Sequence, residues 1–203
     1  MQNQSIIPDP HDPFIAARTA MVVSQLHPSG IITERVLNAY QTVRRENFVP
    51  RDKGSICYSD ETIDLSNGTF LLEPLVHGLL TEHLAIQGSD KILIVGDPTG
   101  YTKAIMNELS SSVFECSDGA GLADQAPFDV IFIAGAVSEF PAALIDQLAT
   151  DGRIGGVVAA DKTLMGQVVI TTKNQAGILA HRLIKDAKVP YIKGGSPQSK
   201  FVF

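Results

Sequence analysis

The residues best suited to binding a ligand follow a run of apolar β-formers at residues 91–95 (KILIV). Such a run predicts a buried parallel strand, and Gly96, Asp97 and Gly100 follow it in a tight turn that leads into a helix. In open α/β sheets, a turn of this kind lies at the carboxyl edge and presents amide hydrogens to a ligand. Pro98 interrupts the Gly-x-Gly-x-Gly pattern, because proline has no amide hydrogen to donate. Gly96, Asp97 and Gly100 are therefore candidate cofactor-binding residues in a loop that lacks one donor.

A carboxylate stands at the end of the next short strand. Glu115 lies about 20 residues after Gly96, where an acidic residue commonly accepts hydrogen bonds from ribose hydroxyls. Glu115 is also compatible with an ordinary solvated carboxylate, and Asp97 beside Pro98 with a plain turn. The two glycines could equally serve the sharp turn alone.

The histidines and cysteines do not suggest a metal centre. His77 and His83 are six positions apart and face different sides of the predicted helix. Cys57 and Cys116 form no Cys-x-x-Cys motif and have no paired histidine, so we expect reduced structural thiols. Neither Gly-x-Ser-x-Gly, a phosphate loop nor His-Glu-x-x-His occurs, so hydrolase and nucleotidase functions have no specific support.

The composition predicts an ordinary soluble globular protein. The chain has 203 residues, of which 44% are hydrophobic and 19% charged, enough for one domain with a substantial core. A net charge of -6 disfavours a nucleic-acid partner, because such binding depends on clustered Lys and Arg. No leader pattern and no run of about 18 apolar residues is present. We therefore expect a cytoplasmic protein that neither enters a membrane nor is secreted.

Hydrophobic periodicity divides the chain into a helical first part and a sheet-forming second part. Residues 1–13 carry three prolines and predict a flexible tail, while residues 14–203 predict a single domain, helical over 14–89 and sheet-forming over 90–203. Helices are predicted over residues 14–27, 34–48 and 73–88. Residues 58–65 suggest a polar connector, followed by a turn signal at Asn67-Gly68.

The second part alternates strands and helices. Predicted strands, after the one at 91–95, are 112–116, 128–134, 153–160, 167–172 and 178–184. Predicted helices are 103–109 and 139–148. The last two strands favour an antiparallel pair around residues 174–177 (NQAG). This order is typical of an α/β, Rossmann-like methyltransferase sheet.

From about Thr19 to Phe203 the chain resembles the protein-L-isoaspartate O-methyltransferase family. The matching segments are MVVSQL (21–26), GI (30–31), RVL (35–37), RENFVP (45–50), YSD (58–60), EP (73–74), GDPTGY (96–101), FDVI (128–131), QL (147–148) and DGR (151–153). Each is weak alone, but their order is specific. The resemblance implies an S-adenosylmethionine-dependent methyltransferase fold with N-terminal helices. It also implies methyl transfer to the carboxylate of an isoaspartyl residue in a damaged protein or peptide, with no metal.

The resemblance also assigns roles to residues outside the glycine turn. Asp60 lies where the family closes over its peptide, although an exposed polar loop would look the same. Asp118 resembles an acidic loop near the adenine, although a bare loop fits Asp118 equally well. The family's Gly-Gln-Thr-Ile-Ser segment corresponds to residues 68–72 (GTFLL), so Phe70 and Leu72 replace both hydroxyls. Thr69 is the hydroxyl that remains nearby, and Thr69 and Asp60 are the catalytic candidates.

Two further departures concern the donor site and the sheet. Ile94 stands where the family has an acidic residue before the first glycine. Residues 117–127 are too few for a strand-helix-strand unit of about 30 residues. We therefore expect a central sheet that lacks one strand and one helix, with residues 112–116 as either its second or its third strand. The resulting open edge invites pairing with a second copy, which suggests a homodimer.

Three functions fit the sequence. The first is an active S-adenosylmethionine-dependent carboxyl methyltransferase. The second is a family member with reduced or lost activity that acts as a binding or scaffold protein on the same fold. The third is an enzyme that acts on another small metabolite in the same crevice. The damaged donor loop and substrate segment favour the second.

Overall fold

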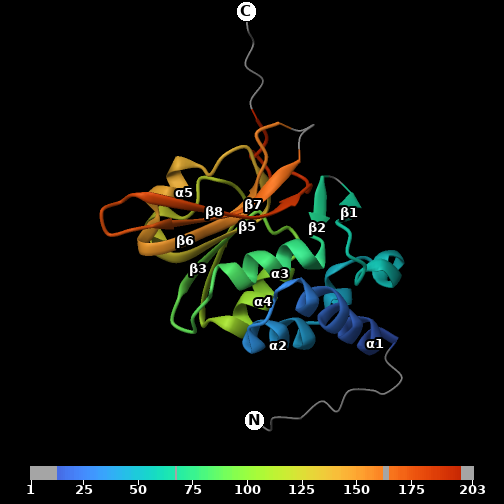
Figure 1. Cartoon of the computed structure of the whole chain (residues 1–203). Coiled ribbons are helices and arrows are strands. Elements are labelled where there is room, and N and C mark those ends of the chain that lie inside the picture. The colour runs from blue at the N-terminus through green and yellow to red at the C-terminus, as the bar shows by residue number, and fades with distance from the viewer. Residues whose placement is uncertain (1–12, 67, 162–164, 198–203) are drawn as a thin grey trace, which may run out of the picture.

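The computed structural model describes residues 13–66, 68–161 and 165–197. Helices pack against a six-stranded sheet, and a two-stranded hairpin stands beside them (Figure 1). The predicted tail lies outside the described residues except for Pro13, which is the first residue of α1. In the described part of the chain, no helix is both long enough and apolar enough to cross a lipid bilayer.

The N-terminal part is largely helical, as the periodicity predicts, but the prediction that the second helix continues to Phe48 is wrong, because Val43 is extended and ends α2. Its helical segments are α1 (Pro13–Ala20), η1 (Met21–Leu26), η2 (His27–Ser29), α2 (Glu34–Thr42), η3 (Arg45–Phe48), η4 (Arg51–Ile56) and α3 (Pro74–His83). The prediction that the third helix extends to Gly88 is wrong. The chain turns at Ala85, with φ 48°, and two arginine side chains bind the carbonyls at the end of α3. Arg153 Nε donates to Leu84 O at 2.7 Å, and Arg182 Nη2 donates to His83 O at 3.2 Å.

A hairpin replaces the last three residues of the predicted polar connector. β1 (Ile63–Ser66) and β2 (Thr69–Leu71) pair antiparallel, so the connector prediction is wrong from Ile63 onward. Ile63 is buried and anchors β1 in the core, which the short polar sequence does not reveal. Gly68 has φ +73°, as the turn prediction requires, while Asn67 lies outside the described residues.

The central sheet has the order β4-β3-β5-β6-β7-β8. Its strands are β3 (Lys91–Val95), β4 (Ser112–Cys116), β5 (Phe128–Val137), β6 (Leu148–Val158), β7 (Gly166–Lys173) and β8 (Leu179–Ala187). The connecting helices are α4 (Tyr101–Leu109), η5 (Ala123–Gln125) and α5 (Ala142–Asp146). The first four strands in this order are parallel, and β7 and β8 add antiparallel as predicted.

The predicted boundary between the fifth helix and its following strand is wrong. α5 ends at Asp146, and Leu148 already pairs with Phe128 as the first residue of β6. The ladder is irregular after that pair, because Asp151 has φ 61°, and regular pairing resumes where Arg153 meets Val130. The Asp-Gly pair that suggested a helix exit therefore lies inside a bulged strand.

The short connection between Cys116 and Phe128 holds the single 3₁₀ turn η5. β4 pairs directly with β3, which makes residues 112–116 the second strand of the sheet rather than the third. β4 is the outer strand of the described sheet. The prediction of a shortened Rossmann-like sheet is therefore confirmed.

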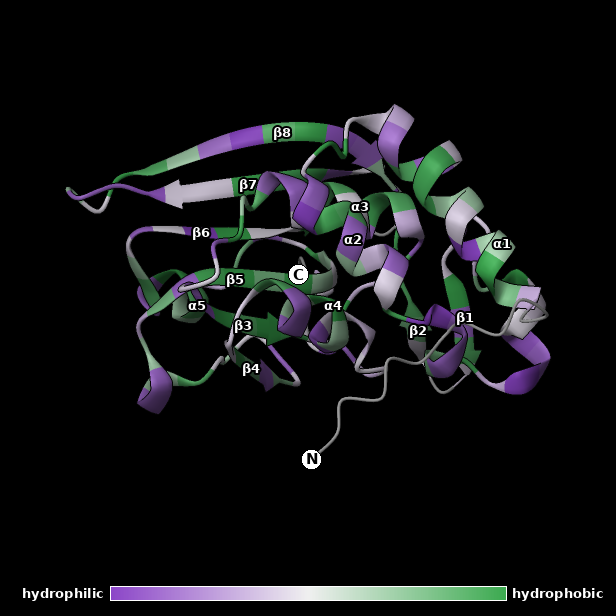
Figure 2. Cartoon of the chain, turned by 90° about the horizontal axis from the view of Figure 1, so that it is seen from below, coloured by the Kyte–Doolittle hydropathy of each residue, from purple (hydrophilic) through white to green (hydrophobic). Residues whose placement is uncertain are grey.

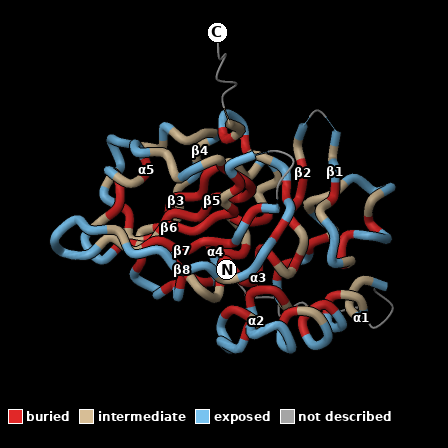
Figure 3. The backbone as a smooth tube through the Cα atoms, turned by 45° about the horizontal axis from the view of Figure 1, so that its top comes forward, coloured by how far each residue is buried: buried red, intermediate tan, exposed pale blue. Residues whose placement is uncertain are grey.

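The sheet has a hydrophobic core on each face. The larger core fills the space between the sheet and α2, α3 and α4, and includes Leu80, Ile94 and Ile105. The smaller core, with Leu93 and Leu144, lies on the α5 face. Figure 3 shows the central strands as buried and much of β8 as exposed. Figure 2 shows the same contrast in hydropathy, with β3 hydrophobic and long hydrophilic stretches along β8.

Candidate functional site

Asp97 binds the first turn of α4 with both carboxylate oxygens. Its Oδ1 accepts hydrogen bonds from the amides of Thr99 at 3.0 Å and Gly100 at 3.1 Å, and from the Thr99 hydroxyl at 2.7 Å. Its Oδ2 accepts from the amides of Thr102 at 2.8 Å and Lys103 at 3.4 Å. The amides that a helix N-terminus would offer to an anionic ligand are thus already bonded within the chain.

The C-terminal segment, residues 187–197, crosses the carboxyl ends of β3 and β5. Ala136 N donates to Pro190 O at 2.8 Å, and Ile192 N donates to Ala136 O at 3.0 Å. A Cβ atom on Gly96 would lie 2.6 Å from Ile192 Cγ2, so Ile192 packs directly on the first glycine of the loop. Gly96 also has φ +76°, which glycine adopts without strain. Ile192 therefore fills part of the space above the glycine loop.

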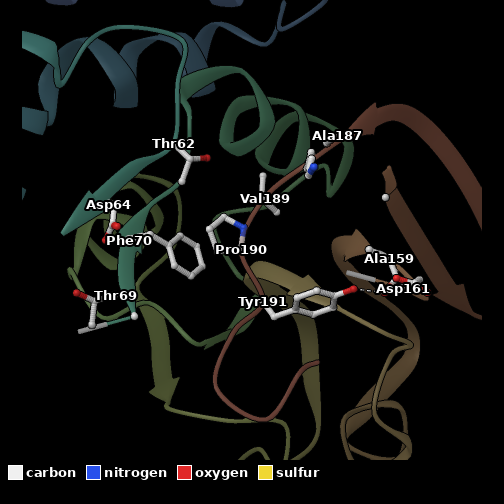
Figure 4. Close-up of a pocket in the computed structure, with 13 residues that line it drawn as sticks. Thr62, Asp64, Thr69, Phe70, Ala159, Asp161, Ala187, Val189, Pro190 and Tyr191 are labelled. Carbon is white, nitrogen blue, oxygen red and sulfur yellow. Dashed lines mark hydrogen bonds between the residues drawn. The ribbon is translucent and has the colours of Figure 1, made fainter. Parts of the chain in front are cut away.

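Two adjacent cavities lie on either side of this segment. The loop cavity, about 410 Å³, is lined by Gly96, Asp97, Pro98, Ser117, Ile192 and Lys193, and by four residues that also line the second cavity. The hairpin cavity, about 590 Å³, is lined by Thr62, Asp64, Ala159, Asp161, Gly166 and residues 187–190, together with the same four (Figure 4). The shared residues are Gly68, Thr69, Phe70 and Tyr191. Phe70 and Tyr191 therefore stand between the two cavities.

Phe70 and Tyr191 are both fixed by packing or hydrogen bonding. Phe70 is 5% exposed, and its Cζ would lie 2.8 Å from a Cβ atom added to Gly135. Tyr191 donates its hydroxyl hydrogen to Ala159 O at 2.6 Å, as Figure 4 shows. Burial, followed by the charge of Asp161, raises the pKa of Tyr191. The aromatic partition is therefore built from β2 on one side and from the C-terminal segment on the other.

The remaining sequence-predicted residues are dispersed. Glu115 accepts a hydrogen bond from Lys103 Nζ at 2.5 Å, on the α4 side of β4, and does not line the loop cavity. Asp118 lies outside that cavity as well, and its Oδ1 accepts from Ala120 N at 3.0 Å. Gly100 directly precedes α4, with φ +78°, and lines neither cavity. Only Gly96 and Asp97 among the cofactor candidates border the loop cavity.

The two catalytic candidates have partners of their own. Thr69 lines both cavities, and its hydroxyl donates to Ser66 O at 2.8 Å across the hairpin turn. Asp60 accepts from Leu75 N at 3.1 Å and so caps the first turn of α3. Asp60 borders neither cavity. The structure thus brings Thr69, but not Asp60, to the crevice.

A buried polar network connects α2 and α3 to the first turn of α4. Tyr40 Oη and His77 Nδ1 are 2.5 Å apart, and His77 Nε2 lies 3.2 Å from Thr102 Oγ1. Burial, and secondarily the Arg45 charge, lowers the pKa of His77 to about 3, so the imidazole is neutral at pH 7. Among the described residues, no group of three or more His, Cys, Asp or Glu side chains could hold a metal ion. His77 is therefore a structural residue beneath the loop.

Sequence reasoning missed the C-terminal contribution to the site. Tyr191, Ile192 and Lys193 line the loop cavity, yet no motif marks residues 187–197 as functional. The available signal is the alternation of Pro190 with Gly194-Gly195 after a strand, which indicates an irregular segment. That signal does not show where the segment lies in the fold, because its backbone hydrogen-bond partners, Ala136 and Ser138, come more than fifty residues earlier in the sequence.

The sheet, its helices and the strand-end crevice define a Rossmann-like methyltransferase fold. Two solved structures share it. One protein-L-isoaspartate O-methyltransferase has a TM-score of 0.71 at 20% identity, with 85% of this chain and 65% of that chain covered. A putative protein-L-isoaspartate O-methyltransferase from Plasmodium falciparum, crystallised with S-adenosyl-L-homocysteine, has a TM-score of 0.67 at 17% identity, with coverages of 85% and 97%.

Sequence comparison is more specific than the fold. The model of the family described as Protein-L-isoaspartate(D-aspartate) O-methyltransferase (PCMT) matches residues 17–116 and 107–194. A Koribacter versatilis protein-L-isoaspartate O-methyltransferase is 35% identical, with 91% of this chain and 95% of the relative covered. A second such enzyme, from Marinobacter nauticus, is 32% identical with coverages of 76% and 83%. The chain belongs to the protein-L-isoaspartate O-methyltransferase family.

Proposed function

We propose that this chain is a protein-L-isoaspartate O-methyltransferase family protein whose methyl transfer is reduced or lost, and whose crevice binds a protein segment. The observation that carries the proposal is the position of the Asp97 carboxylate, which accepts the amides of Thr99, Gly100, Thr102 and Lys103. A cofactor would have to displace this carboxylate to reach those donors. The loop therefore serves the fold of α4 instead of a ligand.

The residues around the loop cavity do not fit S-adenosylmethionine, the methyl donor that the family uses. Pro98 offers no amide hydrogen, and Ile192 packs on Gly96, where close approach of a ligand needs free space. Glu115, the one carboxylate at the ribose position, is paired with Lys103 Nζ. Lys193 adds a positive charge to a cavity that would have to accept a sulfonium cation. We therefore derive no catalytic step through this cofactor.

The expected loss of affinity is large. A hydrogen bond to a charged group contributes about 1.5–3 kcal/mol, so losing the ribose carboxylate, one loop donor and the α4 amides removes several kcal/mol. A change of about 4 kcal/mol separates a micromolar from a millimolar dissociation constant. Binding of the cofactor should therefore fall to the millimolar range.

Isothermal titration calorimetry with S-adenosylhomocysteine tests the proposal. We expect a dissociation constant of about 1 mM or weaker, and no methyl transfer from S-adenosylmethionine to an isoaspartyl peptide. A matched variant, Asp97→Ala with Pro98→Gly, frees the α4 amides and restores a loop donor, so it should bind S-adenosylhomocysteine at least ~10-fold more tightly. A micromolar dissociation constant for the unmodified protein would overturn the proposal.

The alternative is an active carboxyl methyltransferase. It is favoured by the loop cavity itself, which keeps about 410 Å³ beside Gly96 and Asp97. Methylation of an isoaspartyl peptide by the unmodified protein would establish it.

Because Cys57 and Cys116 are free thiols, we also propose the cytoplasm as the compartment.

A further inference from the structure

The hairpin cavity is the larger hollow of the crevice and differs in chemistry from the loop cavity. It opens between the β1–β2 hairpin, the ends of β6 and β7, and the start of the C-terminal segment (Figure 4). Its volume of about 590 Å³ lies within the range of sites that enclose a ligand group. Phe70 closes the side that faces the loop cavity, so a group bound here stays apart from anything bound above Gly96.

The inner wall of the hairpin cavity is apolar. Phe70, Val189 and Pro190 lie together in the close-up, and Ala159 and Ala187 complete this wall (Figure 4). The hydroxyls of this surface are already donating, since Tyr191 bonds Ala159 O and Thr69 bonds Ser66 O. An apolar group loses little solvation in such a pocket, whereas a carboxylate placed against this wall would find both of these hydroxyl hydrogens already used.

The rim of the same cavity is predominantly negative. Asp64 pairs directly opposite Phe70 across the hairpin, so both side chains share one face. Asp161 lines the far side, and among the residues that the structure describes Lys188 is the one lysine that borders the cavity. Behind the hairpin, burial and then the Asp60 charge raise the pKa of Glu73, while Lys185 opposes that shift. Within the described ranges, carboxylates therefore outnumber lysines around the opening, and a negatively charged group is disfavoured there.

We propose that the hairpin cavity binds an apolar side chain of an extended protein segment that carries Lys or Arg beside it, and that Phe70 sets this preference. The apolar wall receives the side chain, and the rim carboxylates attract the flanking positive charge. An isoaspartyl carboxylate would meet the Phe70 ring and two like charges. The inference rests on the proposed function in one respect, namely that the crevice binds protein.

Fluorescence anisotropy with labelled peptides tests the preference. Three seven-residue peptides differ only at chosen positions: a central Leu flanked by Lys, a central isoaspartate flanked by Lys, and a central Leu flanked by Glu. We expect the unmodified protein to bind the first at least ~10-fold more tightly than either of the others. Equal affinities, tighter binding of the isoaspartyl peptide, or no binding of the first peptide at millimolar concentration would overturn the proposal.

Two variants assign the preference to named residues. Phe70→Thr removes the ring and should reduce the Leu-over-isoaspartate preference below ~3-fold, whereas Phe48→Thr should leave it unchanged. Phe48 serves as the control, because it is a partly buried phenylalanine that packs on Tyr101 and borders neither cavity. Asp64→Lys, on the exposed hairpin, should weaken the first peptide at least ~5-fold even if Phe70→Thr fails to fold. An unchanged preference in folded Phe70→Thr, or unchanged binding in Asp64→Lys, contradicts the proposal.

Cofactor binding is a separate measurement, so the two ideas fail in different ways. Micromolar S-adenosylhomocysteine binding together with a leucine preference overturns only the proposed loss of methyl transfer. Millimolar S-adenosylhomocysteine binding together with an isoaspartate preference overturns only the assignment of the hairpin cavity.

Discussion

At the scale of single residues, one side chain decides how the glycine loop is used. The sequence identifies Asp97 correctly as a residue of the loop but leaves open whether it binds a ligand or a turn. In the structure, both carboxylate oxygens of Asp97 accept hydrogen bonds from backbone amides of α4 and of the turn before it. Glu115 is similar, because its spacing from Gly96 predicts a ribose ligand, whereas in the structure its carboxylate pairs with Lys103 in the first turn of α4. Spacing alone gives the position of a carboxylate, whereas its partner depends on the folded geometry.

His77 should make stability depend on pH in a predictable direction. The unfolded chain protonates this histidine near pH ~6.5, whereas the folded chain does so only near pH 3, because burial opposes the charge. Between these values the unfolded state binds more protons, so the free energy of unfolding rises with pH and levels off above pH ~6.5. His77→Gln should remove a slope of about 1.4 kcal/mol per pH unit, measured by urea unfolding between pH ~5 and ~7.5.

The control for this prediction is His27→Gln, because His27 is exposed on η2. Its unfolding free energy should keep the slope of the unmodified protein. Parallel curves for His77→Gln and the unmodified protein would contradict the assignment of the slope to the buried imidazole.

At the scale of elements, local sequence patterns predict the strands of the central sheet. They miss the elements whose conformation depends on contacts with residues distant in the sequence. β3 and β4 begin and end where the apolar runs predict. The β1–β2 hairpin is missed because its strands have only four and three residues, and it is anchored by long-range burial of Ile63, Phe70 and Leu71 in the core. The C-terminal segment is missed because its backbone partners lie on β5. The site is built largely from these two missed elements.

The contact between the glycine loop and the C-terminal segment can be measured by a double-mutant cycle. Gly96→Ala and Gly100→Ala both force alanine to φ near +77°, which costs about 1–2 kcal/mol each. Only Gly96→Ala also meets Ile192, so it should cost a further ~1–3 kcal/mol, while a Cβ atom on Gly100 would meet nothing within 4 Å. Ile192→Ala should reduce the destabilisation caused by Gly96→Ala by about 1 kcal/mol, as measured by denaturant unfolding. Its effect on the free energy of unfolding should simply add to that of Gly100→Ala. Additivity in both pairs would show that the segment does not rest on the loop.

At the scale of the whole molecule, a short connection changes how the sheet meets solvent. Residues 117–127 leave no room for a further strand and helix, so β4 forms the outer edge. The opposite edge, β8, is longer and carries His181, Arg182, Lys185 and Asp186, charges that discourage strand pairing. β4 has one charged side chain, Glu115, and Lys103 neutralises it. Of the two edges, β4 is therefore the one open to another strand.

We propose that two copies pair through their β4 edges, and light scattering tests this directly. The unmodified protein should show twice the mass of one chain at about 100 µM, because an edge strand whose single charge is ion-paired offers its backbone donors and acceptors to a second strand. Val113→Lys places like charges opposite each other in such a pair and should give the mass of one chain. Leu183→Lys is the matched control, since Leu183 is 60% exposed on β8 at the far edge, and it should leave the mass unchanged. A single-chain mass for the unmodified protein would exclude β4 as the contact. A mass that falls in Leu183→Lys but not in Val113→Lys would exclude it as well, because Val113 lies on β4 and Leu183 lies on β8.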